Sequence, residues 1–255
     1  MGLKSTVIAG LQKLPPRAFW TVMALLRPPR HFGDDLAMWN RDIPFERDAA
    51  FEAAYAESIT FATPEVQQMD VRWRAYTACW AASVAAKLPG DFVECGVNTG
   101  LLSGTICRYL AFQTLEKSFW LFDTYEGIPA ALASATERPN IDKYNAQYPD
   151  VWDVANRNFE AYPSAQLIRG MIPDSLHTVD INRVSYLSID LNIAAPEKSA
   201  LEHFWPKMTP SGLVLLDDYG FSRHAEQRKV ADEFAADVGT KILPLATGQG
   251  LLFKN

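Results

Sequence analysis

The sequence has few cysteines and no hydrophobic run long enough to span a membrane. Its three cysteines, Cys79, Cys95 and Cys107, form no CxxC pair, so neither a zinc knuckle nor a disulfide framework is indicated. Because unpaired thiols are typical of a reducing compartment, we expect a cytoplasmic location. The apolar run at residues 18–26 is shorter than the roughly 20 residues that a membrane-spanning helix needs. Prolines at 15 and 16 also argue against a signal peptide.

The first 33 residues, called the head below, contain no acidic residue and five basic residues. Since the whole chain of 255 residues has a formal charge of -6, the remainder carries -11, which does not favour nucleic acid as a partner. In the head, the run at 18–26 lies between Arg17 and Arg27. It predicts a helix packed on the body or on a partner chain, with a weak membrane-surface contact as the alternative.

The chain changes its pattern near Pro89. Apolar residues recur at helical spacing over 34–88, whereas short β-rich runs then alternate with amphipathic stretches. The second pattern is typical of a parallel sheet with helices on both faces. We therefore predict a helical N-terminal extension over 1–60 and an α/β domain over 61–255. The predicted strands are 92–95, 118–122, 166–168, 184–189, 213–216, 241–245 and 251–254, of which the last two form a hairpin.

A glycine turn follows the first of these strands and leads into a helix near Leu101. Gly96 and Gly100 lack a Cβ and let a ligand approach the backbone, and free amides at the helix start favour an anionic group. Glu94, two residues before Gly96, suits a ligand with an ammonium group, such as the methionine end of S-adenosylmethionine. A nicotinamide dinucleotide is the alternative, although its G-x-G-x-x-G pattern has glycine where this sequence has Asn98. A tight turn without any ligand is the other alternative.

The next predicted strand ends at Asp123, on the edge of the sheet where ligands of open α/β folds bind. A carboxylate there can accept hydrogen bonds from both hydroxyls of a ribose. A helix cap is the alternative for an aspartate in this position. Together with the glycine turn one strand earlier, Asp123 predicts a nucleoside site.

Three further aspartates follow two later strands. Asp190 comes directly after 184–189, and Asp217 and Asp218 come directly after 213–216. Because consecutive βαβ units usually lie side by side, we expect these carboxylates to converge without an obvious basic partner in the sequence. A hard divalent cation such as Mg²⁺ would relieve their repulsion. The alternative is that they cap a helix or are solvated.

Four ordered segments together resemble the macrocin O-methyltransferase family: 90–97, 122–129, 170–176 and 213–220. The resemblance covers roughly residues 51–255. It implies a Rossmann-like, seven-stranded class I methyltransferase fold in which S-adenosylmethionine is the methyl donor. It further implies a small-molecule acceptor with a hydroxyl group, such as a sugar or natural-product intermediate, and Mg²⁺ held by residues matching Asp190, Asp217 and Asp218.

From the residues and the resemblance together, we predict nine donor-binding residues within an S-adenosylmethionine-binding domain over 61–255. They are Glu94, Gly96, Asn98, Thr99, Gly100, Asp123, Gly170, Met171 and Ile172. The stretch 127–150 has no clear element, and long loops in compact domains often cover a ligand. We expect it to close over the acceptor.

One position departs from the family. Many relatives carry an acid two residues after the first metal-binding aspartate, a position considered for the general base, and here that residue is Asn192. An amide cannot take the proton. Asp190 is expected to be catalytic, and His224 is the nearest titratable candidate for a base, with an exposed histidine at a helix start as the alternative. Asn192 also leaves open a catalytically impaired, methyltransferase-like binding protein.

Two arginines in the helical region have no assigned partner in the sequence. Arg72 and Arg74 are expected to meet an acidic group of the substrate or a second subunit, or to be solvated. A homo-oligomer is implied only by analogy.

Overall fold

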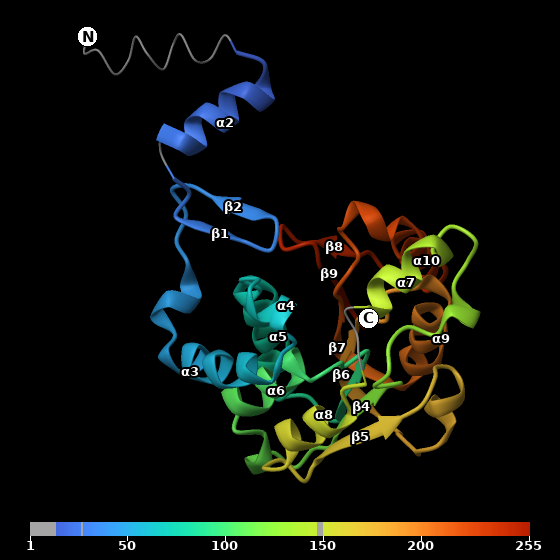
Figure 1. The fold of residues 1–255 in the computed structure, drawn as a ribbon. Helices are drawn as coiled ribbons and strands as arrows, with labels where there is room; N and C mark the ends of the chain where they lie inside the picture. Colours follow the sequence, from blue (N-terminus) through green and yellow to red (C-terminus); the bar gives the residue numbers. More distant parts are fainter. Residues whose placement is uncertain (1–13, 27, 147–149) are drawn as a thin grey trace. The chain divides into compact units, whose positions relative to one another are not determined.

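The computed structural model describes residues 14–26, 28–146 and 150–255 (Figure 1). The chain divides into two compact units, Met1–Pro44 and Phe45–Asn255. In the first unit, helix α2 (Pro16–Leu26) confirms the predicted helix at 18–26. Within the described part of the chain, no helix is long and apolar enough to cross a membrane. Lys4, Lys13 and Arg27, three of the five basic residues of the head, lie outside the described residues, so the membrane-surface contact of the head stays a prediction.

The first unit also contains an antiparallel hairpin of β1 (His31–Gly33) and β2 (Leu36–Met38). The helical interpretation is therefore wrong for the start of the segment 34–88. Asp34 and Asp35 have φ angles of 51° and 60°, which make a two-residue turn that reverses the chain. Periodicity could not reveal this because strands of three residues are too short to show a pattern.

The second unit begins with helices that pack on one another. They are η1 (Pro44–Arg47), α3 (Ala49–Ser58), η2 (Ile59–Phe61), α4 (Pro64–Gln67) and α5 (Arg72–Ala85). The ring of Phe51 in α3 contacts Tyr76 in α5 at 5.0 Å and Tyr109 in α6 (Leu101–Tyr109) at 6.3 Å between centroids. The unit boundary therefore precedes residue 60, where the sequence pattern placed the end of the extension. A donor-binding domain over 61–255 stays a prediction.

A seven-stranded sheet forms the centre of the second unit. Its strands are β3 (Asp91–Cys95), β4 (Phe119–Asp123), β5 (Ala165–Arg169), β6 (Val184–Ile189), β7 (Met208–Leu216), β8 (Leu243–Pro244) and β9 (Gly250–Phe253). The order across the sheet is β5-β4-β3-β6-β7-β9-β8. The pairs from β5 to β7 are parallel, and the hairpin β8–β9 joins antiparallel. All seven predicted strands and the hairpin are confirmed.

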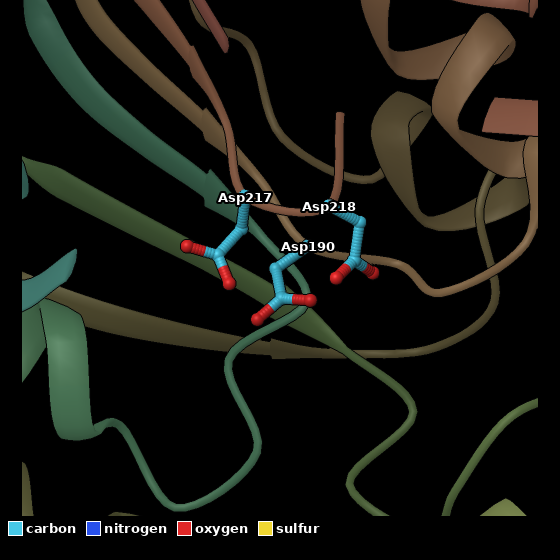
Figure 2. A group of neighbouring side chains, drawn as sticks. All are labelled: Asp190, Asp217 and Asp218. Carbon is cyan, nitrogen blue, oxygen red and sulfur yellow. The ribbon is translucent and has the colours of Figure 1, made fainter. Parts of the chain in front are cut away.

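The strand register brings the predicted acids to one edge of the sheet. Cys95 at the end of β3 pairs with Phe122 of β4 and with Ile189 of β6, and Ile189 pairs with Leu216 of β7. The aspartates that follow these partners therefore leave the sheet at the same level. Figure 2 shows that the side chains of Asp190, Asp217 and Asp218 turn toward one another there. The expected pairing of β6 with β7 is confirmed.

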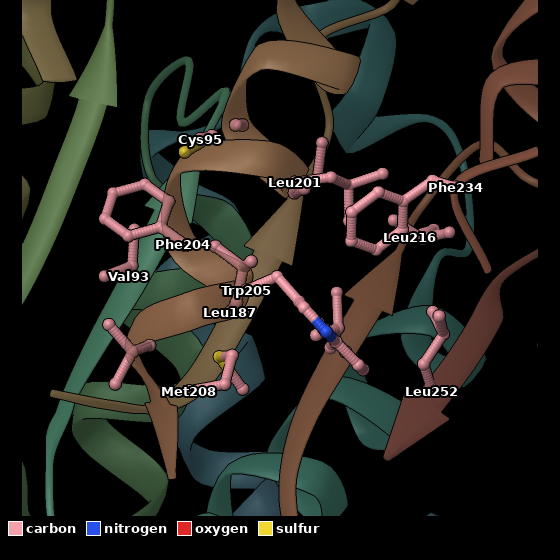
Figure 3. Packing of buried hydrophobic residues seen from close by; sticks show 14 of the residues in the cluster. Val93, Cys95, Leu187, Leu201, Phe204, Trp205, Met208, Leu216, Phe234 and Leu252 are labelled. Atoms are coloured by element: carbon pink, nitrogen blue, oxygen red, sulfur yellow. The ribbon is translucent and has the colours of Figure 1, made fainter. Parts of the chain in front are cut away.

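Helices cover both faces of the sheet, as predicted. On one face, Val93 and Leu187 pack with Phe204 of α9 (Ala194–Phe204) and Phe234 of α10 (Ala225–Asp237) (Figure 3). On the other face, Phe92 packs against Phe112 of η3 (Phe112–Thr114), and α5 contacts β6 and β7. The remaining helices are η4 (Ala130–Leu132), α7 (Arg138–Asn145), α8 (Trp152–Phe159), η5 (Asp174–His177), η6 (Trp205–Lys207) and η7 (Ser222–His224).

The stretch 127–150 is not devoid of elements, because it contains η4 and α7. The expectation was wrong since α7 is mostly polar and has one fully buried apolar residue, Ile141. Ile141 packs with Ile128, Ala133 and Ile193 in a small core of its own. This core attaches the stretch to the start of α9.

The turn after β3 depends on Gly96, which has a φ of 90°. A Cβ at this residue would lie 1.8 Å from the carbonyl oxygen of Asp190. The space that the glycine leaves is therefore filled by the protein's own backbone rather than by a ligand, contrary to the expectation. The turn after β3 and the turn after β6 are in contact because residue 96 has no side chain.

We expect Gly96→Ala to destabilise the fold by roughly 3 kcal/mol or more, since the clash adds to the cost of positive φ. Urea unfolding monitored by circular dichroism would measure this. Gly239→Ala is the matched control: its φ is 69°, but no described atom outside its immediate neighbours lies within 4 Å of its Cβ position. The control should cost about 1 kcal/mol. Equal losses in the two variants would contradict the packing role of Gly96.

Candidate active site

A cavity opens at the carboxyl ends of β3, β4 and β6. Seven of the nine predicted donor-binding residues line it: Glu94, Gly96, Asn98, Thr99, Asp123, Gly170 and Ile172. Gly100 and Met171 are not among its described lining residues. A Cβ at Gly100 would meet the ring of Phe159 at 2.4 Å, so this glycine makes room for α8. The side chain of Met171 is exposed.

Asp123 holds the glycine turn. Its Oδ2 accepts hydrogen bonds from the backbone amides of Val97 at 2.6 Å and Asn98 at 2.7 Å, and its Oδ1 accepts one from Tyr125 at 2.7 Å. The expectation of free amides is therefore wrong for Val97 and Asn98, because a carboxylate of the protein already takes them. Asp123 also borders the cavity, and its contact with a ribose stays a prediction.

Glu94 places a carboxyl group at the bottom of the cavity. Its side chain is 1% exposed, and among the described residues its Oε2 has no hydrogen-bond partner. Burial raises the pKa of Glu94 to about 8, and the negative charges of Asp217 and Asp123 raise it further. The hydroxyls of Ser103 and Ser188 lower this pKa in part. A cationic group in the cavity would restore the charged form of the carboxylate.

Asp190, Asp217 and Asp218 form the candidate metal centre. One carboxylate oxygen from each lies within 4.8 Å of the others (Figure 2). Burial raises the pKa of Asp190 well above its usual range, and the charges of Asp217 and Asp218 raise it further. All donors are carboxylate oxygens, the ligand type that Mg²⁺ prefers. Asp190 also lines the cavity, so the two predicted sites adjoin.

The cluster has a basic partner, contrary to the expectation. Nη1 of Arg74, in the first turn of α5, forms an ion pair with Oδ2 of Asp217. Nε2 of Gln249 donates a hydrogen bond of 2.8 Å to Oδ1 of the same carboxylate. Arg72 pairs with Asp70 at 2.6 Å, and its contact with a substrate group or a second subunit stays a prediction.

Asn192 lies beside the cluster in a left-handed conformation, with a φ of 61°. Its Nδ2 donates a hydrogen bond of 3.1 Å to Oδ1 of Asp190. Asparagine tolerates positive φ better than most residues, and its amide can donate where a second carboxylate would repel. Residue 192 therefore orients Asp190.

His224 is buried at 3% exposure, so the alternative of an exposed histidine is wrong. Its Nδ1 lies 3.4 Å from Oδ2 of Asp218 and 2.6 Å from the side-chain amide of Gln227. Its Nε2 accepts a hydrogen bond of 3.1 Å from Nε of Arg223. Burial, and then the charge of Arg223, lower the pKa of His224 to about 4, so the ring is neutral near pH 7.

Sequence reasoning missed two buried polar residues beside the centre. Gln249 is 0% exposed and lies in the β8–β9 hairpin. It was missed because nothing in the sequence distinguishes it from other polar residues in turns. Glu197 is buried in the first turn of α9, and burial and the charge of Asp218 raise its pKa well above the usual range. An acid in the first turn of a helix is so common that Glu197 gave no signal.

A second cavity lies on the other side of Asn192, which borders both cavities. One wall consists of residues from 136–144, which include part of α7, and the other consists of residues 223–227 from η7 and the start of α10. Asn140 and Tyr144 line one wall, and Arg223 and His224 line the other. The Tyr144 and His224 rings stack at 6.3 Å, and Thr136 donates a hydrogen bond of 3.0 Å to Glu226 across the two walls.

The raised pKa of Glu94 predicts a pH dependence of stability. Between its ordinary pKa of 4.5 and about 8, the folded state keeps a proton that the unfolded state has lost. Stability should therefore fall as pH rises, by about 1.4 kcal/mol per pH unit in this window. Glu94→Gln should remove this contribution from urea unfolding curves between pH 5 and 8, and the exposed Glu160→Gln should not. Identical pH slopes in all three proteins would refute a proton on Glu94.

The chain resembles characterised methyltransferases in sequence. The Macrocin-O-methyltransferase (TylF) family profile matches residues 66–242. The 8-demethyl-8-(2,3-dimethoxy-alpha-L-rhamnosyl)-tetracenomycin-C 4'-O-methyltransferase of Streptomyces olivaceus is 28% identical over 149 residues, or 55% of this chain and 57% of that protein. Mycinamicin III 3''-O-methyltransferase of Micromonospora griseorubida is 24% identical over 157 residues, or 55% and 59%. The chain thus spans just over half the length of these relatives.

Solved structures have the same fold. The O-methyltransferase NovP matches with a TM-score of 0.67 and 20% identity, over 84% of this chain and 100% of that one. The SAH-bound methyltransferase PaMTH1 of Podospora anserina matches with a TM-score of 0.52 and 14% identity, over 86% and 98%. The Rossmann-like class I methyltransferase fold is therefore confirmed. Because the family profile covers most of the sheet and its helices, the chain belongs to the macrocin O-methyltransferase family.

Proposed function

We propose that the protein is an S-adenosylmethionine-dependent and Mg²⁺-dependent O-methyltransferase that acts on a hydroxyl of a small molecule, a sugar or natural-product intermediate. The observation that carries the proposal is that Asp190 belongs to both the three-aspartate centre and the cavity above Glu94. A donor in that cavity and an acceptor held at the centre would therefore be adjacent. The named activities of the sequence relatives support the acceptor class.

The methyl donor fits the first cavity by charge. The unpartnered Oε2 of Glu94 suits the ammonium of the methionine part, and a cation there would draw the proton from this carboxyl group. Asp123 would accept the ribose hydroxyls while it keeps the turn at Val97 in place. The segment at Gly170 would border the adenine.

Asp190, Asp217 and Asp218 would hold Mg²⁺, since the donor set consists only of carboxylate oxygens close to one another. When bound, the ion would supply a Lewis acid that lowers the pKa of the acceptor hydroxyl. Asn192 would keep Asp190 oriented through its hydrogen bond. The chain's own contribution is to align donor and acceptor for in-line transfer of the methyl group.

The second cavity would take the part of the acceptor that extends beyond the three-aspartate centre, because its walls carry hydroxyl, amide and charged groups suited to a polar molecule. Asn192 borders this cavity and donates a hydrogen bond to Asp190 of the centre. Asn140 and Tyr144 of α7 line it, which supports the predicted role of the stretch 127–150 as a cover. The proton of the hydroxyl must go to a group other than Asn192. His224 is neutral and borders this cavity. Its Nε2 could take the proton once the hydrogen bond from Nε of Arg223 to this atom is broken.

A catalytically impaired binding protein is the second candidate, because Asn192 stands where relatives carry an acid. A nicotinamide oxidoreductase is not retained, since the chain belongs to a methyltransferase family and Asn98 interrupts the dinucleotide pattern. A homo-oligomer and a cytoplasmic location stay predictions.

Asp190→Asn should lower kcat/KM by about a hundredfold or more, since it removes one charged ligand while keeping the shape of the side chain. The assay is multi-turnover transfer of labelled methyl groups to a panel of hydroxylated sugars and glycosides with Mg²⁺. Calorimetry should find donor binding unchanged within about threefold. The exposed Asp153→Asn is the control.

Turnover that survives both Asp190→Asn and chelation would contradict the metal proposal but would not contradict methyl transfer. If S-adenosylmethionine binds but no acceptor in the panel turns over, the hypothesis of a catalytically impaired binding protein is favoured over that of an active methyltransferase.

His224→Gln tests the proton acceptor. If His224 is the base, kcat should fall by about a hundredfold and the pH profile should lose its acidic limb, while the Mn²⁺ dissociation constant stays unchanged. If the ring only orients Asp218, metal affinity should fall instead. Retention of both the rate and the metal affinity would leave His224 without a role in the reaction.

A further inference from the structure

Arg74 connects the helical region to the candidate metal centre. Its side chain is 18% exposed, and it forms an ion pair with Asp217, a partner that is 143 residues away and 1% exposed. The guanidinium also lies 5.8 Å from the ring centroid of Phe221. Gln249 links the same two residues, because its Nε2 lies within hydrogen-bond distance of the backbone carbonyl of Arg74 and of Oδ1 of Asp217.

The three carboxylates lie beside different protein groups. Both oxygens of Asp217 face protein donors, Arg74 and Gln249. At Asp190 the donor is the amide of Asn192. At Asp218, Nδ1 of the His224 ring lies 3.4 Å from Oδ2. Arg74 is the one of these donors with a fixed positive charge. Its charge therefore lies against a carboxylate that belongs to the candidate metal centre.

We propose that Arg74 is an intramolecular competitor of the divalent cation: it pairs with Asp217 in the metal-free protein, offsets one of the three negative charges, and weakens metal binding. The proposal rests on the metal centre of the proposed function. The neighbouring positive charge lowers the affinity of the carboxylates for a cation, in the way that it lowers their affinity for a proton.

The pairing has a second consequence for the metal-free protein. Three converging carboxylates destabilise the fold through mutual repulsion, and Arg74 reduces that repulsion without a ligand. Loss of the arginine should therefore make the fold depend on the metal. Stability measured with and without a divalent cation reports this dependence independently of catalysis.

Mn²⁺ binding to the full chain tests the proposal, measured by calorimetry and by the electron paramagnetic resonance signal of free Mn²⁺. Arg74→Met keeps the apolar stem and removes the charge, and should tighten the dissociation constant by about ten- to a hundredfold, the order by which a neighbouring charge shifts a carboxylate's proton affinity. Arg74→Lys keeps the charge and should lie close to the wild type. Arg72→Met, two residues away on the same helix and paired with Asp70, is the matched control.

Thermal unfolding gives the second readout. In excess chelator, Arg74→Met should unfold at a lower temperature than the wild type and the control, and Mn²⁺ should raise its Tm by more than it raises theirs. Equal Mn²⁺ dissociation constants in the wild type and Arg74→Met, or weaker binding in the variant, would overturn the competition while leaving the metal centre intact. If none of the four proteins binds Mn²⁺ at millimolar concentration, both the competition and the metal part of the proposed function are wrong.

Discussion

Mutual repulsion of carboxylates at one edge of the sheet is the constraint around which the site is built. β6 and β7 are parallel neighbours, and the residues that follow them are Asp190, Asp217 and Asp218. Glu94 lies one strand away, and its raised pKa reflects burial and the charge of Asp217. Such a group of acids is unfavourable in a folded protein unless cations or hydrogen-bond donors compensate it. The elements that meet at this edge supply those donors.

The compensating residues come from distant parts of the chain. Arg74 lies at the start of α5, Gln249 lies in the terminal hairpin, and His224 precedes α10. Each contact therefore attaches one element to the end of β7. The three-aspartate centre thus contributes to tertiary structure, whatever its role in chemistry. A change that removes a carboxylate affects the helices through the donors that it leaves buried without a partner.

The sheet and the positions of its acids could be predicted because they depend on local pattern. Buried strands such as 184–189 appear in the sequence as short apolar runs. Parallel strands bring their carboxyl ends to one edge of the sheet. The hairpin at 31–38 and the helix α7 could not be found, since one is too short and the other too polar for periodicity. The partner of Asp217 could not be found either, because a pairing over 143 residues leaves no trace in spacing.

The glycine turn was correctly located, and it borders the cavity as expected, but its glycine and its amides also serve contacts within the protein. Glycine is needed at residue 96 because the backbone of Asp190 fills the space, and the amides at 97 and 98 are taken by Asp123. Both facts tie the donor side of the site to the acceptor side. The turn that would seat the donor lies directly on Asp190, the first residue of the candidate metal centre. An alteration at either one is transmitted through main-chain atoms, which cannot change rotamer to absorb it.

Asn192 can now be interpreted through its neighbours rather than through the acid that it replaces. A carboxylate at this position would add a charge beside Asp190, whose pKa is already raised by burial and by Asp217 and Asp218. The amide instead donates to Asp190, and its left-handed backbone suits asparagine. Arg74 acts in the same direction at Asp217. In this chain the centre therefore carries less uncompensated charge, and it would rely more on the geometry of its donors than on a strong local base.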